Sequence, residues 1–217
     1  MTEARRRHLI ETAVEMNRCG INQGTSGNLS IRHESGMLIT PSGMAYSTLE
    51  PDDIVFVDGN GEHHGPRQPS SEWRIHHDIY QARADAGAIL HAHPTDCAAL
   101  ACLNKPIPAF HYMVAVAGGR DIRCAPYATF GTQALSNHVL EALKDRKACL
   151  MASHGLICLA GNLDQALALA IEVEQLAQTY VHCLSVGKPV ILDDKEMDRV
   201  LLKFKSYGVQ DIDGSAE

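Results

Sequence analysis

A short apolar run ends in two histidines in the sequence Gly87-Ala88-Ile89-Leu90-His91-Ala92-His93-Pro94. The run predicts a buried β-strand over residues 87–91. Side chains at positions i and i+2 of a strand project from the same face, and the rise is about 3.3 Å per residue. The imidazoles of His91 and His93 can therefore converge on one ion, which makes this strand end half of a candidate metal site.

Two further groups with the same ligand chemistry lie elsewhere in the chain. They are Glu72 in Pro69-Ser70-Ser71-Glu72-Trp73 and His154 in Met151-Ala152-Ser153-His154-Gly155. Neutral imidazoles and a carboxylate suit zinc and its neighbours, and a catalytic site must also open a coordination position. With three histidines fixed, Glu72 is the ligand that could leave. It could then take or return a proton beside the cation, which would stabilise an enolate-like oxygen as a Lewis acid.

The competing interpretation is that these histidines are ordinary polar residues. The chain has 12 histidines, so some close pairs are expected without any function. His63-His64 and His76-His77 are such pairs, and adjacent side chains point away from each other on a strand or a helix. His91 and His93, taken alone, could be two satisfied polar groups near a strand end. Glu72 and His154 favour the metal site, because each also lies at the end of a predicted element. We expect no ligands among the remaining histidines, which are His8, His33, His63, His64, His76, His77, His138 and His182.

Helical and extended patterns are interleaved along the whole chain. Strands are predicted over residues 29–32, 37–40, 54–57, 87–91, 148–151 and 156–159, and helices over 3–19, from Ser70 or Ser71 to about 83, and over 95–103, 131–144, 162–186 and 194–207. Glu72 is expected in the first turn of the second helix. Frequent hairpin turns, such as Asp58-Gly59-Asn60-Gly61, favour a mixed, mostly antiparallel sheet covered by helices. We expect one α/β domain over residues 1–217.

Composition limits the partners and the compartment. The formal net charge of −7 argues against nucleic acid or an anionic membrane surface, because either needs a dense basic patch. The one basic cluster, Arg5-Arg6-Arg7, is expected to be a solvated helix face. No apolar stretch has the roughly 18 residues of a membrane span, and no signal peptide is apparent. Seven cysteines without a C-x-x-C pair indicate reduced thiols, so we expect a soluble cytoplasmic protein.

Three turn segments form a candidate anion site. They are Gly27-Asn28, Ser42-Gly43 and Ser70-Ser71, and all are small and polar. Glycine-containing turns and the start of a helix expose backbone N–H groups, which bind phosphate without lysine or arginine. Ordinary turn and cap chemistry is the alternative for each segment taken alone. The phosphate interpretation is favoured because Ser70-Ser71 directly precedes Glu72.

Several motifs together resemble the class II aldolase/adducin family, over nearly the whole chain. They are the run from Asn22 to Ser30 (NQGTSGNLS), Leu38-Ile39-Thr40-Pro41-Ser42-Gly43, Pro69-Ser70-Ser71-Glu72-Trp73, His91-Ala92-His93 and His154-Gly155. Residues 108–113, 124–132 and 203–208 are most similar to the members that act on L-fuculose 1-phosphate. The resemblance implies an α/β/α fold and a ring-shaped homotetramer with its sites at subunit interfaces.

The resemblance also implies roles for individual residues. It implies one zinc ion per subunit held by Glu72, His91, His93 and His154, and phosphate held by Asn28, Ser42, Gly43, Ser70 and Ser71, with Gly27 shaping the loop. Tyr112 is implied to reach the site of a neighbouring subunit and act on the aldehyde oxygen, although such a tyrosine is usually a packing residue. Phe130 and the catalytic candidate Tyr207 match residues at the aldehyde end, although Tyr207 could simply dock the last helix.

The implied activity is reversible cleavage of a ketose 1-phosphate into dihydroxyacetone phosphate and an aldehyde, without a lysine Schiff base. The ketose could be L-fuculose, 5-deoxyribulose or 5-methylthioribulose 1-phosphate. A methylthioribulose-1-phosphate dehydratase and a sugar-phosphate 4-epimerase remain as alternatives, and neither releases dihydroxyacetone phosphate. A non-catalytic adducin-like interaction domain should lack the metal ligands, and all four are present here.

Overall fold

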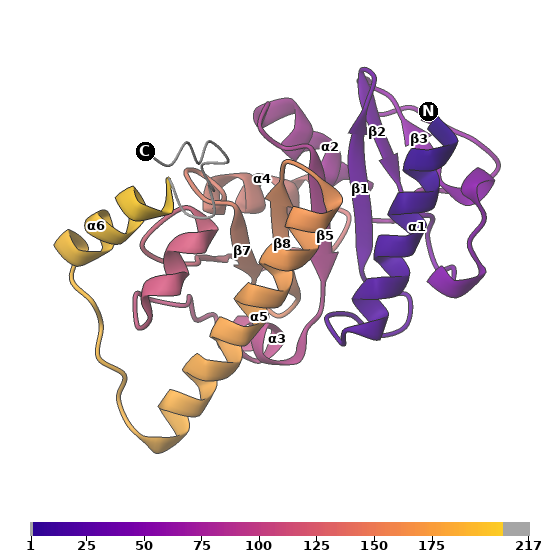
Figure 1. Ribbon diagram of the computed structural model, residues 1–217. Coiled ribbons are helices and arrows are strands. Elements are labelled where there is room, and N and C mark those ends of the chain that lie inside the picture. The colour runs from indigo at the N-terminus through magenta and orange to yellow at the C-terminus, as the bar shows by residue number, and fades with distance from the viewer. Residues whose placement is uncertain (1, 206–217) are drawn as a thin grey trace, which may run out of the picture.

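The computed structural model of the protein describes residues 2–205 and contains one eight-stranded sheet (Figure 1). The strands are β1 (Asn28–His33), β2 (Gly36–Ile39), β3 (Val55–Val57), β4 (His63–His64), β5 (Ala88–Ala92), β6 (Cys124–Ala125), β7 (Ala148–Met151) and β8 (Gly155–Ala160). The helices are α1 (Thr2–Arg18), α2 (Trp73–Ala82), α3 (Thr95–Cys102), α4 (Gln133–Ala142), α5 (Leu163–Val186) and α6 (Asp194–Phe204), with short 3₁₀ helices η1 (Tyr46–Thr48), η2 (Pro51–Asp53) and η3 (Tyr112–Ala117). Every predicted element is present, and β4 and β6 are additional.

The sheet has the strand order β4-β3-β2-β1-β5-β8-β7-β6. All neighbouring strands are antiparallel except β6 and β7, which are parallel. The prediction of a mixed, mostly antiparallel sheet is therefore confirmed. The histidine strand β5 lies between β1 and β8, and His91 is in register with Asn28 on one side and Ile157 on the other.

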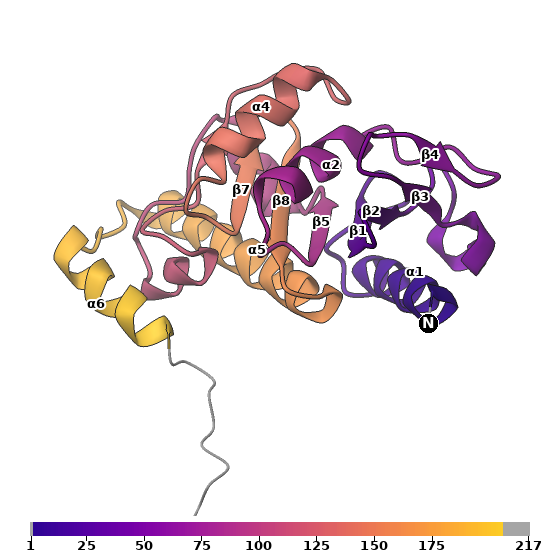
Figure 2. The same ribbon diagram turned by 90° about the horizontal axis from the view of Figure 1, so that it is seen from above.

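Helices cover both faces of the sheet, as Figure 2 shows. On one face α1, α3 and α5 pack on a core that includes Leu29 and Leu90, and on the other α2 and α4 pack on a core that includes Ile89 and Ile157. Because side chains alternate along a strand, His91 lies on the same face as Ile89, toward α2 and α4. This alternation separates the polar site from the larger core.

The start of α2 differs from the prediction. Glu72 is the residue that precedes the helix, so the prediction that it lies in the first helical turn is wrong. Ser70 accounts for the difference, because its hydroxyl accepts the N–H of Glu72 at 3.3 Å and its carbonyl accepts the N–H of Trp73 at 3.0 Å. A turn therefore separates Ser70 from the helix and presents Glu72 at its end.

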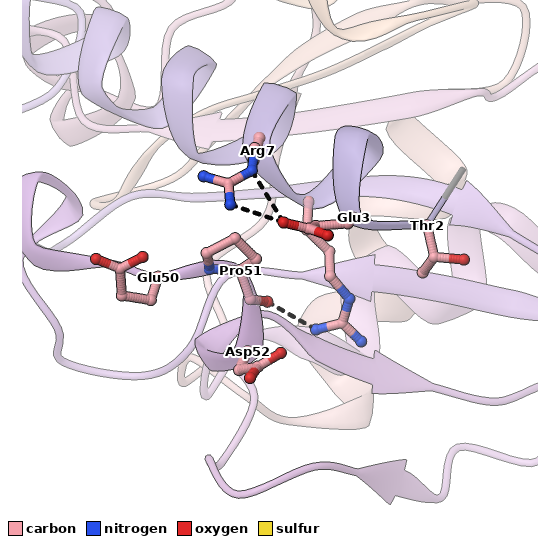
Figure 3. A pocket seen from close by; sticks show the side chains of 7 residues that line it. Thr2, Glu3, Arg7, Glu50, Pro51 and Asp52 are labelled. Atoms are coloured by element: carbon pink, nitrogen blue, oxygen red, sulfur yellow. Dashed lines mark hydrogen bonds and ion pairs between the residues drawn. The ribbon is translucent and has the colours of Figure 1, made fainter.

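The basic cluster on α1 is partly used by the fold. Arg5 and Arg7 are exposed, as expected, and Arg7 pairs with Glu3 at 2.7 Å. Arg6 is half-buried and donates to the carbonyl of Pro51 at 2.9 Å, so the prediction of a solvated helix face is wrong for this residue. Figure 3 shows these contacts in the hollow between α1 and η2. Within residues 2–205, no helix has both the length and the apolar character needed to cross a membrane.

Candidate metal centre

Three histidines from two distant segments of the sequence meet at one end of the sheet. One ligand nitrogen from each of His91, His93 and His154 lies within 4.8 Å of the others. His91 Nε2 and His93 Nε2 are 2.9 Å apart. The Glu72 carboxylate completes the group, with Oε2 at 2.9 Å from His91 Nε2 and Oε1 at 3.3 Å from His154 Nε2. The structure thus brings together all four predicted metal ligands.

Backbone geometry at the β7–β8 turn makes room for this cluster. Ser153 has a positive φ of 52°, which turns the chain sharply before His154. A Cβ atom at Gly155 would lie 2.7 Å from Cδ2 of His93 and 2.5 Å from the carbonyl oxygen of Ala92. Both distances are too short for a side chain, so the glycine after His154 is required by the close approach of His93.

The hydrogen bonding of the cluster fits a bound cation. His91 Nδ1 lies 2.8 Å from the carbonyl oxygen of Leu156, so this nitrogen carries a proton and the lone pair of the neutral ring is on Nε2, toward the cluster. Glu72 Oε1 is buried and accepts no hydrogen bond from any described residue. A buried carboxylate oxygen without a donor is costly unless a cation compensates it.

The charge state of the cluster also suits metal binding. Burial favours a higher pKa for Glu72, but the nearby His91 and His154 and the Asn28 amide outweigh it and hold the pKa well below its usual range. Burial, together with the neighbouring His91, lowers the pKa of His93 and of His154 to about 4. At neutral pH the carboxylate is therefore ionised and these two imidazoles are neutral, which are the forms that bind a metal. Burial lowers the pKa of His91, but the adjacent Glu72 carboxylate outweighs it and raises this pKa, so a bound cation would take the place of the proton on this ring.

A buried residue beside the cluster was missed by sequence reasoning. His76 is completely buried, and its Nε2 lies 2.6 Å from Oδ1 of Asn28, whose Nδ2 donates to Glu72 Oε2 at 3.1 Å. His76 is not among the three clustered histidines, but it supports a residue that contacts one ligand. The available signal was its spacing of four residues from Glu72, which would place both on one face of the helix predicted to start at Ser70 or Ser71.

The three segments of the candidate anion site lie side by side. Thr40 donates its N–H to the carbonyl of Leu29 at 3.0 Å, which places the Ser42-Gly43 segment next to Gly27-Asn28. Ser70 N–H donates to the carbonyl of Thr40 at 3.0 Å, so Ser70-Ser71 adjoins the same segment. Gly43 has a φ of 68°, and a Cβ at Gly27 would lie 2.7 Å from the carbonyl oxygen of His91. The turns are therefore assembled beside the metal cluster.

A cavity of about 340 Å³ opens onto the cluster. Its lining is formed by Ser26, Ser71, Glu72, His93, Tyr127, Ala128, Phe130, Ser153 and His154. Phe130 lies here as predicted, whereas Tyr127 was not singled out from the sequence, and each is 62% exposed. A Cβ at Gly131 would lie 2.8 Å from the carbonyl oxygen of Ser71, so the loop that carries Tyr127 and Phe130 packs directly on the turn before Glu72.

Tyr112, one of the two predicted catalytic tyrosines, does not line this cavity. Tyr112 is 52% exposed and lines a separate cavity of about 870 Å³ with residues of α6, so within one chain it does not meet Glu72. Its action in a neighbouring subunit stays a prediction. Tyr207 lies outside the described residues.

The family of the chain follows from comparison with known proteins. The sequence profile described as "Class II Aldolase and Adducin N-terminal domain" matches residues 7–181. The chain belongs to this family, which confirms the predicted resemblance and the predicted fold.

Its relatives include enzymes named for their substrates. The chain is 56% identical over 205 residues to a 5-methylthioribulose-1-phosphate/5-deoxyribulose-1-phosphate aldolase of Rhodospirillum rubrum, covering 94% of this chain and 93% of the relative. It is 55% identical over 205 residues to the L-fuculose phosphate aldolase of Escherichia coli strain K12, covering 94% and 95%. A solved structure of L-fuculose 1-phosphate aldolase superposes with a TM-score of 0.90 at 42% identity, covering 93% and 96%. These names agree with the predicted enzyme class, an aldolase.

Proposed function

We propose that the protein is a metal-dependent class II aldolase that reversibly cleaves a ketose 1-phosphate into dihydroxyacetone phosphate and an aldehyde. One observation carries this proposal. It is the buried Oε1 of Glu72, which accepts no hydrogen bond from the described residues and faces three converging imidazoles at the edge of a cavity. The names of the relatives support L-fuculose, 5-deoxyribulose or 5-methylthioribulose 1-phosphate as the substrate.

The ligand set proposed for the metal is His91, His93, His154 and Glu72. Three imidazoles and one carboxylate suit Zn²⁺, so we assign one zinc ion to each subunit. When bound, the ion supplies a Lewis acid next to the negative charge that develops on the substrate.

Glu72 is proposed to hold and return the proton at the reacting carbon. Its carboxylate is ionised and has one oxygen without a hydrogen bond from the described residues, so that oxygen is available as a base. Because Glu72 lines the cavity, a bound substrate can reach it without a change in the backbone.

The turns beside the metal cluster are proposed to bind the substrate phosphate. Asn28, Ser42, Gly43, Ser70 and Ser71 are the assigned contacts, with Gly27 needed for the close approach of the chain. Backbone N–H groups and hydroxyls suit this anion in the absence of a lysine or arginine among the assigned contacts.

The aldehyde end is proposed to form between subunits of a homotetramer. Phe130 contributes from the chain that holds the metal, and Tyr112 from a neighbouring subunit acts on the aldehyde oxygen. Tyr207, which lies outside the described residues, is assigned to the same aldehyde end. The exposure of Tyr112 supports such a role, since a packing residue would be covered. All seven cysteines lie within residues 2–205 and are free, which supports a reducing compartment, the cytoplasm.

The proposal is tested by running the reaction toward synthesis. Zinc-loaded protein is incubated with dihydroxyacetone phosphate and L-lactaldehyde, acetaldehyde or a thioether aldehyde, and ketose phosphates are measured. We expect condensation that EDTA abolishes and that Glu72→Gln lowers by at least about 100-fold. Borohydride should trap no adduct. Activity that survives both EDTA and Glu72→Gln would overturn the proposal, and turnover of ketose phosphates without any dihydroxyacetone phosphate would indicate a dehydratase or an epimerase.

A further inference from the structure

A line of buried polar side chains runs from Glu72 into the space between β1 and α2. Beyond Asn28, the ring of His76 continues the line, and its Nδ1 lies 2.7 Å from Oγ of Ser30. Ser30 Oγ in turn lies 3.0 Å from the hydroxyl of Tyr80. All five side chains are buried. Among the five only Glu72 lines the cavity, and His76, Ser30 and Tyr80, which are assigned no contact with the substrate, act on the site from behind.

The direction of each hydrogen bond in this line follows from its two ends. An ionised carboxylate only accepts, so Asn28 must present its NH₂ group to Glu72. The amide oxygen then faces His76, and it is satisfied only if His76 Nε2 carries the proton. Burial, with the nearby His91, lowers the pKa of His76 to about 3, so the ring is neutral and Nδ1 has a lone pair. The Ser30 hydroxyl donates to that lone pair and accepts from Tyr80.

The other neutral tautomer gives a conflict at the carboxylate. With the proton on Nδ1, His76 would accept at Nε2, and the Asn28 amide would have to turn its NH₂ group toward the ring. The amide oxygen would then lie where the nitrogen now is, 3.1 Å from Glu72 Oε2. Two acceptors at this distance repel in a buried site.

We propose that His76 is a positioning residue that fixes the orientation of Glu72 through Asn28. With Nε2 protonated, His76 holds the Asn28 amide so that its N–H group anchors Oε2 of Glu72. The second oxygen, Oε1, then faces the histidines and the cavity. The effect on catalysis rests on the proposed function, whereas the tautomer and the orientation do not.

The first test reads the tautomer directly. Protein with ¹⁵N-labelled histidine is examined by long-range ¹H–¹⁵N correlation, and His76→Gln identifies the signal of His76. We expect a protonated Nε2 and an unprotonated Nδ1 at neutral pH, with and without zinc. A ring protonated on Nδ1 overturns the proposal.

The second test separates positioning from stability. His76→Leu should lower kcat by about 10–100-fold, the usual cost of losing such a supporting contact, with a much smaller change in KM. His76→Gln keeps an N–H donor near the position of Nε2 and should recover most of kcat. His77→Gln is the matched control, because the neighbouring ring contacts the carbonyl of Gly59 instead of the site. Equal kcat in the Leu and Gln variants overturns the proposal.

One further variant tests what fixes the tautomer. Ser30→Ala removes the donor to Nδ1 while Asn28 still accepts from Nε2, so the ring should stay protonated on Nε2 with only a small loss of kcat. A ring that becomes protonated on Nδ1 in Ser30→Ala contradicts the assignment of the tautomer to Glu72 and Asn28. If the wild-type protein shows no aldolase activity at all, the proposed function fails, and the NMR result still decides the tautomer.

Discussion

Within residues 2–205, two groups of acidic and histidine side chains lie close enough to hold a metal, and they differ in how their polar atoms are used. In the first, His91, His93 and His154 meet the carboxylate of Glu72 at the end of β5. In the second, Asp58, Glu62 and His64 meet at the β3–β4 hairpin, and their ligand atoms also lie within 4.8 Å of one another. Distance alone therefore does not separate the two groups.

Hydrogen bonding and burial do separate them. Asp58 Oδ1 already accepts the N–H groups of Asn60 at 2.8 Å and Glu62 at 3.0 Å, so this carboxylate stabilises its own turn. Glu62 and His64 are exposed. Glu72, in contrast, is 5% exposed and has an oxygen that no described residue bonds. A buried ligand atom without a hydrogen-bond partner therefore marks a metal site better than the proximity of ligand types does.

The largest expected effect is the stabilisation of the fold by zinc. Zinc at about 1,000 times its Kd should raise the free energy of unfolding of the wild-type protein by about 4 kcal/mol. Urea unfolding in zinc and in EDTA measures this difference. His64→Ala should gain as much as the wild type. If zinc stabilises His91→Ala by as much as the wild type, the buried cluster is not the zinc site.

The next effect is on zinc affinity. His91→Ala should weaken binding by more than about 100-fold, since a lost ligand costs at least as much as a lost supporting contact. Competition with a chromogenic chelator gives the two Kd values, and far-UV circular dichroism confirms that the variant is folded. His64→Ala is the matched control, with an affinity equal to that of the wild type. A weaker affinity in both variants would mean that both groups take part.

A smaller effect, when it is measured per pH unit, is the loss of stability in acid. Because burial lowers the pKa of His76 to about 3, this ring stays neutral in the folded protein while the unfolded chain takes up a proton below about pH 6.5. The free energy of unfolding of the metal-free protein should therefore fall by up to about 1.4 kcal/mol per pH unit as pH decreases from 6.5 toward 3. Urea unfolding should show a shallower slope for His76→Gln, with His64→Gln as the matched control. Identical slopes for wild type and His76→Gln would contradict this account.

The smallest effect is expected at the hairpin. Asp58→Ala removes the acceptor of two backbone N–H groups in an exposed turn, so the Tm should fall by only about 2 °C. Zinc affinity and aldolase activity should not change. Differential scanning calorimetry and the chelator competition measure both. A loss of zinc binding here would assign the metal to the hairpin.

Local patterns were sufficient for most of the fold. Apolar spacing predicts α1 and α5, and the Asp58-Gly59-Asn60-Gly61 turn predicts the β3–β4 hairpin. The pair His91 and His93 is readable because a strand places alternate residues on one face. Each of these features depends on neighbours in the sequence, which is why one chain is enough to find them.

Contacts between distant segments were not readable in this way. His76 resembles half of a chance pair with His77, and its role depends on Ser30 and Asn28, which are 46 and 48 residues away. Likewise, Glu174 on α5 accepts the N–H groups of Asp96 and Cys97 at the start of α3, both at 2.9 Å. No local spacing indicates such partners. The position of Glu72 before α2 also depends on how Ser70 uses its hydroxyl and carbonyl, which propensity does not decide.

The pairing of Asn28 with His91 across β1 and β5 has an evolutionary consequence. Deleting one codon within either strand would shift the pairing by one position and turn every following side chain to the opposite face of the sheet. A deletion in β1 would remove Leu29 from its core, and one in β5 would remove Leu90, in the same event that takes Asn28 and His91 out of register. A deletion that misaligns the site therefore also destabilises the fold, so degradation of unstable protein in the cell removes such variants.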